Sequence, residues 1–92
     1  MKMLCKVVEV LTQREFKNSA NEDVVVLPII LSQGTDSFIG EVVGSAIASL
    51  PEGLGGNDMV WCDLSFYTRE VKLKDGVSLV NQKISIKNVV RL

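Results

Sequence analysis

The sequence contains no histidine, and its aromatic residues are three phenylalanines, one tyrosine and one tryptophan among 92 residues. Without histidine, the chain lacks the side chain that most often acts as a general base or metal ligand near neutral pH. A Cys–His nucleophile pair is also impossible. The two cysteines, Cys5 and Cys62, lack metal-ligand spacing, and we interpret them as buried thiols in a reducing cytosol. We therefore expect no catalytic centre, no bound metal and no cofactor.

Long hydrophobic runs and an excess of charge of one sign are also absent. No window approaches the roughly 18 apolar residues of a membrane-spanning helix. Lys6 and Glu9 interrupt the apolar N-terminal segment and no small-residue cleavage site follows, so we expect no targeting signal and a soluble, cytoplasmic protein. The net charge is −1, so any nucleic-acid role must rest on a local basic patch.

The acidic and glycine-rich segments do not match catalytic motifs. The carboxylates show no paired spacing, and Glu22-Asp23 is more typical of a solvated loop than of a metal site. Gly53, Gly55 and Gly56 precede an expected strand, whereas a phosphate-cradling glycine motif precedes a helix. These patterns indicate that the protein is not an enzyme.

The residues that are abundant predict a single all-β domain spanning residues 1–92. Hydrophobic residues make up 47% of the chain, and many of them are valine and isoleucine, which favour strands. A chain of this length forms one domain with a modest core.

Residues 59–92 predict a long β-hairpin, because Asp75-Gly76 separates two alternating runs and suits a tight turn. Alternation assigns one face of the first strand to the core, with Val60, Cys62, Leu64 and Phe66. Its outer face carries Trp61, Asp63, Ser65, Tyr67 and Arg69. The second strand places Val80, Ile84 and Ile86 inside. Its outer face carries Leu79, Asn81, Lys83, Ser85, Lys87 and Arg91.

The rest of the chain predicts three strands and one short helix. Residues 3–16 form a first strand long enough to require a bend or bulge. Residues 24–32 and 37–43 form the next two, with Gly40 at a bend that suits a barrel corner. Residues 44–54 are the helix candidate, with Ser45 as a possible N-cap and Pro51 ending its regular part at Leu50.

The segment 24–32 is apolar on both faces, although Pro28 interrupts it. Such a strand is either buried inside the chain or covered by a partner. In so small a chain we favour a contact in a homodimer or homotetramer over full internal burial. The expected oligomer contact consists of Val24, Val26, Pro28 and Ile30.

The order strand, strand, strand, helix, strand, strand predicts a five-stranded OB-fold barrel with one short helix between strands 3 and 4, because closure hides the strand edges. Several segments carry a more specific resemblance: Phe38-Ile39-Gly40, the helix 43–50, the glycine loop before Val60-Trp61-Cys62, Phe66-Tyr67-Thr68-Arg69 and the Lys74-Asp75-Gly76 tip. On these residues the chain resembles the bacterial single-stranded DNA-binding proteins, and in particular short, tail-less OB-fold members. The resemblance implies a non-catalytic protein of DNA replication, recombination or repair, encoded in some cases by a mobile element.

Single-strand binding needs a cationic groove and flat side chains on which bases stack. Trp61 and Tyr67 are outward by alternation, although Trp61 also suits a subunit contact or the barrel end. We assign Phe66 to the core, and Phe38 suits either role. Arg14 and Lys17 flank the first loop, which contacts ligand in OB-folds. The predicted nucleic-acid-binding residues are Arg14, Lys17, Phe38, Trp61, Tyr67, Arg69, Lys72, Lys74, Lys83 and Lys87.

Two functions are compatible with these sequence features. The leading hypothesis is a non-catalytic module that binds single-stranded DNA. The alternative is an OB-like assembly module that binds protein and no nucleic acid, with residues 24–31 as its contact surface. The position of the outward aromatic residues distinguishes the two hypotheses.

Overall fold

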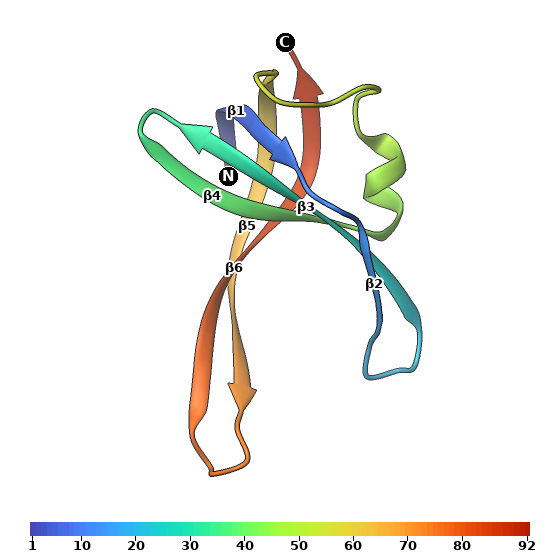
Figure 1. Cartoon of the computed structure of the whole chain (residues 1–92), viewed down its shortest axis with the longest axis vertical. Coiled ribbons are helices and arrows are strands. Elements are labelled where there is room, and N and C mark those ends of the chain that lie inside the picture. The colour runs from blue at the N-terminus through green and yellow to red at the C-terminus, as the bar shows by residue number, and fades with distance from the viewer.

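The computed structural model describes residues 1–92, with the side chain of Val71 left out. Six strands and one short 3-10 helix follow each other along the chain (Figure 1). They are β1 (Lys2–Val10), β2 (Arg14–Lys17), β3 (Asp23–Gln33), β4 (Asp36–Val43), η1 (Gly44–Ser49), β5 (Met59–Lys72) and β6 (Ser78–Arg91). No helix in the described part of the chain is long and apolar enough to cross a membrane.

Five of the strands close into a barrel. The sheet order is β1-β5-β6-β4-β3-β2, and an additional β1–β3 pairing closes the ring. All pairings are antiparallel except β4–β6. These two strands are parallel, and Glu41 of β4 pairs with Ser85 of β6. The helix η1 lies between β4 and β5, the third and fourth strands of the barrel. The predicted five-stranded OB-like barrel with its intervening helix is confirmed.

The predicted first strand is divided into β1 and β2, as its length required. The β1–β3 register shifts between Val7 and Glu9, and the strand is interrupted after Val10. The Leu11 amide still donates to the Pro28 carbonyl at 3.0 Å, which keeps the chain beside β3 through the bend. β2 then pairs with the start of β3 to form a hairpin that projects from the barrel (Figure 1).

The barrel interior is filled by inward-facing aliphatic side chains. Ile29, Leu31, Leu64 and Ile86 are the largest of those that are almost completely buried. Cys5 and Cys62 are also buried, as predicted, and burial raises the pKa of both thiols, that of Cys62 to about 12. Because the thiolate is the reactive form, burial disfavours reaction at both groups.

Gly40 allows β4 and β6 to approach each other closely. A Cβ atom at this position would lie 2.6 Å from Cγ1 and 2.7 Å from Cδ1 of Ile86. No such separation is sterically tolerated in a packed core. The bend that the sequence predicted at Gly40 is therefore a site where a missing side chain lets two strands cross.

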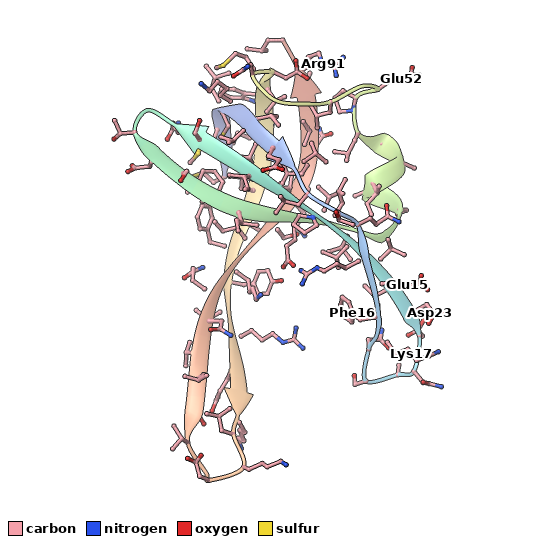
Figure 2. The ribbon with its side chains drawn as sticks, in the orientation of Figure 1. Glu15, Phe16, Lys17, Asp23, Glu52 and Arg91 are labelled. Carbon is pink, nitrogen blue, oxygen red and sulfur yellow. The ribbon has the colours of Figure 1, made fainter. Side chains whose placement is uncertain are left out.

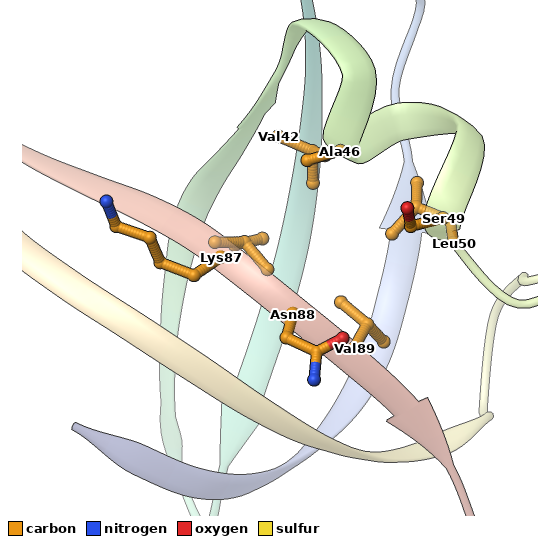
Figure 3. Close-up of a pocket in the computed structure, with 8 residues that line it drawn as sticks. Val42, Ala46, Ser49, Leu50, Lys87, Asn88 and Val89 are labelled. Carbon is orange, nitrogen blue, oxygen red and sulfur yellow. The ribbon is translucent and has the colours of Figure 1, made fainter.

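The helix η1 covers one end of the barrel. Ala46, Ile47 and Leu50 pack against the core, and the space that remains near Val42 and Val89 is only about 10 Å³ (Figure 3). The prediction that Ser45 is the N-cap is wrong, because the N-cap residue is Val43 and no side chain caps the helix. The segment is a 3-10 helix of six residues, shorter than the predicted helix.

Two predictions about the last hairpin also need correction. Phe66 shares the inward face of β5 with Leu64, but it is 47% exposed because the strand has left the barrel at that point. In β6, Asp63 pairs with Asn88 while Leu64 pairs with Ile86, so Lys87 is the extra residue of a β-bulge. The bulge reverses the alternation, and Arg91 therefore lies at the barrel end, where it donates to the Glu52 carbonyl at 2.7 Å.

Candidate functional site

Two hairpins project from the same side of the barrel (Figure 1), and a groove lies between them. We call β2 with the start of β3 the short arm, and the outer halves of β5 and β6 the long arm. The groove has a volume of about 360 Å³, within the size range of ligand pockets. Its lining residues are Arg14, Glu15, Phe16, Glu41, Tyr67, Arg69 and Lys83.

Strand register explains why these residues meet. Residues directly opposite each other on neighbouring strands present their side chains on the same face of the sheet. The opposed pairs that connect the two arms are Phe16–Val24, Arg14–Val26, Pro28–Glu41, Glu41–Ser85 and Lys83–Tyr67. The groove is thus a continuous stretch of the outer barrel face.

The aromatic residues of the groove come from different arms. Phe16 projects from the short arm on the side that faces the long arm (Figure 2). Tyr67 is on β5, opposite Lys83 of β6. Both rings are nearly half exposed although they line a cavity. The groove therefore offers flat apolar surfaces from both of its sides.

A second cavity of about 290 Å³ extends the groove along β4 and β6. It shares Arg14, Glu41 and Lys83 with the first cavity and adds Ile39 and Ile84. Ile39 is exposed, so this extension also has an apolar wall. The two cavities together form one elongated groove rather than a closed pocket.

The groove lining has three cations, Arg14, Arg69 and Lys83, and two carboxylates, Glu15 and Glu41, so it is slightly positive although the chain as a whole is slightly acidic. Arg14 pairs with Glu41 at 3.2 Å, and Lys17 on the short arm pairs with Asp23 at 3.2 Å. Exposed pairs of this kind contribute little stability, so both cations can exchange their partner for a phosphate. In the part of the chain that the structure describes, Arg69 and Lys83 form no salt bridge.

Four of the predicted binding residues line the groove: Arg14, Tyr67, Arg69 and Lys83. Phe16 was missed, although alternation along the short arm places it on the same face as Arg14. Glu15 and Glu41 were also missed, because an acidic residue in a basic groove has no local sequence signal. Lys17 lies on the short arm next to the groove-lining Phe16.

The other predicted binding residues lie outside the groove lining. Phe38 is half-buried and packs against the core. Lys72 and Lys74 are exposed near the tip of the long arm. Lys87 is exposed at the bulge and borders the small space under η1, while its side chain extends away from this helix (Figure 3). Trp61 is also exposed, on the outer face of β5.

Trp61 is the centre of an apolar row across three strands. Leu4 of β1 and Val90 of β6 lie directly opposite it on either side. The exposed fractions of Leu4, Trp61 and Val90 are 39%, 44% and 49%. This row, which we call the Trp61 row, is an exposed apolar feature outside the groove.

The residues expected at an oligomer contact lie on the face of β3 that forms the groove. Val26 and Pro28 are buried within the chain, where Arg14 and Glu41 lie opposite them on the neighbouring strands. These two residues therefore provide no exposed surface for a second copy. Val24 and Ile30 are half-buried. The second apolar face of β3 is thus largely accounted for by internal burial.

No model of a known protein family matches the sequence, and a search of curated proteins found no match. Among the described residues, no three cysteine, aspartate or glutamate side chains are arranged to hold a metal ion. The function must therefore be inferred from the geometry and chemistry of the groove.

Proposed function

We propose that this protein binds single-stranded DNA in the groove between its two arms, without catalysing a reaction, and acts in DNA replication, recombination or repair. The observation that carries the proposal is the meeting of Phe16 and Tyr67 with three cations in one open groove. Aromatic faces and a cationic track are the two features that single-strand binding needs.

The aromatic rings would supply most of the affinity. Each base stacked on an aromatic side chain contributes about 1–3 kcal/mol, whatever the base, because every base has a π-face. Phe16 and Tyr67 are on opposite arms, so successive bases can stack on both sides of the groove. A duplex, whose bases are already paired and stacked, offers no free face to these rings.

The cations would hold the backbone. The net charge of −1 provides no long-range attraction to DNA, so binding must depend on local phosphate contacts. Arg14, Arg69 and Lys83 line the groove, and Lys17 lies next to it. Each neutralised phosphate contributes about −0.7 to the slope of log affinity against log salt, so three to five contacts give a slope of roughly −2 to −3.5.

Fluorescence anisotropy with a labelled oligothymidine, measured at several salt concentrations, tests the proposal. We expect binding at low salt with a slope in that range. A duplex of the same length should bind more weakly. Absence of binding to a long oligothymidine at low salt would overturn the proposal.

A second candidate function is protein assembly, and the Trp61 row favours it. Three exposed apolar side chains in register across three strands suit a contact with another copy or another protein. Light scattering at micromolar concentration should then give a mass above 10.1 kDa, and Trp61→Ser should reduce it. A mass of 10.1 kDa at all concentrations would exclude self-assembly.

A further inference from the structure

Two carboxylates, Glu15 and Glu41, line a groove otherwise rich in cations and apolar side chains, and Glu41 is the one of the two that lines both of its cavities. Glu41 lies on β4, opposite Pro28 of β3 and Ser85 of β6. Its side chain is 18% exposed, whereas the side chain of its partner Arg14 is 65% exposed. The carboxylate therefore lies on the floor of the groove, with Arg14 at the rim.

This position controls how a single strand can lie in the groove. A carboxylate repels phosphate groups, while the cations attract them. The backbone is therefore held near Arg14, Arg69 and Lys83, away from Glu41. The bases then point toward the floor, where the carboxylate of Glu41 accepts hydrogen bonds only.

The bases differ in what they offer to such an acceptor. The Watson–Crick edge of guanine has two adjacent donors, N1–H and the N2 amino group, which match the two oxygens of a carboxylate. Adenine and cytosine present one amino group beside an acceptor nitrogen. Thymine and uracil present one N–H between two carbonyl oxygens. Unstacked bases in single strands are read on these edges.

We infer that Glu41 makes the groove selective for guanine in single-stranded nucleic acid, an inference that rests on the proposed function. Guanine satisfies both oxygens of Glu41 through a bidentate, charge-assisted pair of hydrogen bonds. The other bases satisfy one oxygen and place an acceptor against the other. Buried polar groups left unpaired in this way lower affinity for the wrong base.

The Arg14–Glu41 pair does not block this contact. Arg14 Nη2 donates to Glu41 Oε2 at 3.2 Å, and within the described residues it is the only side chain that donates to this carboxylate. The pair is exposed on the arginine side and therefore weak. When a guanine edge replaces the guanidinium, Arg14 is released to a phosphate at the rim. The ion pair thus keeps the empty groove neutral at its centre.

Short thymidine oligomers with one central guanine, inosine, adenine or thymine test the inference by anisotropy at constant salt. Guanine should bind roughly tenfold tighter than adenine or thymine, as expected for one bidentate contact. Inosine keeps N1–H but lacks the amino group, so its affinity should be intermediate. Glu41→Gln should remove the preference for guanine while binding to the thymidine oligomer persists. Glu52→Gln, the same change of charge on an exposed loop residue outside the groove, should keep the preference.

Different failures have different meanings in this experiment. Equal affinity for all four oligomers overturns guanine selectivity and leaves single-strand binding intact. Absence of binding to every oligomer overturns the proposed function together with the inference. An equal gain in affinity for all oligomers in Glu41→Gln shows that the carboxylate only repels phosphate, which also overturns the inference. If Glu41→Gln does not fold, equal binding of inosine and guanine by the unchanged chain still refutes the bidentate contact.

Discussion

The barrel and the long arm share the strands β5 and β6, yet the alternation of side chains along these strands has different consequences in the two regions. Leu64 and Phe66 lie two residues apart on one face of β5, but Leu64 is 1% exposed and Phe66 is 47% exposed. Alternation decides which face of a strand a side chain occupies. Whether that face is buried depends on what lies over it, and beyond Leu64 the barrel has ended. The long arm is thus a two-stranded ribbon without a core of its own.

This difference assigns the two regions different roles. The barrel holds its shape through a dry interior in which strands on all sides share the same core. An isolated two-stranded hairpin is only marginally stable in water. The arm's exposed apolar residues, which include Phe66, Tyr67 and Leu79, therefore represent surface that a ligand or partner can cover. The most direct tests compare equivalent changes in the two regions.

The largest difference should come from truncating the two neighbours on β5. Leu64→Ala removes a fully buried side chain and should lower the free energy of unfolding by about 2–5 kcal/mol. Phe66→Ala removes the larger side chain but from an exposed position, and should cost less than about 1 kcal/mol. Urea denaturation followed by circular dichroism measures both. Similar losses for the two variants would show that the long arm has a core that contributes to stability.

A smaller loss is expected from filling the strand crossing at Gly40. In Gly40→Ala the new methyl group meets the side chain of Ile86, and the resulting overpacking should cost about 1–3 kcal/mol. Gly55→Ala is a useful control, since the nearest atom to its Cβ would lie at 3.8 Å. Thermal unfolding of both variants checks the prediction. Unchanged stability of Gly40→Ala would mean that β4 and β6 can separate at this point without cost.

Much of the barrel could be predicted from the sequence because its signals are local. Alternation, the Asp75-Gly76 turn and the order of elements predicted five barrel strands and one short helix, and the structure confirms them. The core positions Val60, Cys62, Leu64 and Ile86 follow from the same alternation. The prediction that Ser45 caps the helix was wrong. The segment is a 3-10 helix without a side-chain cap, and its packing against the barrel stabilises it.

The groove could be predicted only in part, because it depends on which strands meet. Arg14 and Lys83 are far apart in sequence, and barrel closure brings them to one face. The bulge at Lys87 has no clear signal in the sequence, yet it separates Lys87 from Lys83 and moves Arg91 to the barrel end. Glu41 belongs to the groove through its pairing with Ser85, the parallel contact between β4 and β6. Such long-range pairings are what alternation alone does not specify.

The affinity for oligothymidine tests whether the aromatic residues on the two arms contact DNA. Phe16→Ala and Tyr67→Ala should each weaken binding to oligothymidine by about 1–3 kcal/mol, because each removes one stacking surface. The salt dependence should stay nearly unchanged, since stacking releases no counterions. Trp61→Ala, outside the groove, should have no effect on affinity. A larger loss in Trp61→Ala than in Tyr67→Ala would move the binding site from the groove to the Trp61 row.

The smallest expected effect distinguishes two lysines of β6 that the β-bulge separates. Lys83 lines the groove, whereas Lys87 is the extra residue of the bulge and borders the small space under η1. Lys83→Ala should make the slope of log affinity against log salt less steep by about 0.7, the contribution of one phosphate contact. Lys87→Ala removes the same charge from the chain but should leave the slope unchanged. A regular strand would place both lysines on one face, and the two variants would then change the slope equally. The salt titration therefore distinguishes the bulged strand from a regular one. Equal changes in the two variants would contradict the separation of Lys87 from the groove by the bulge.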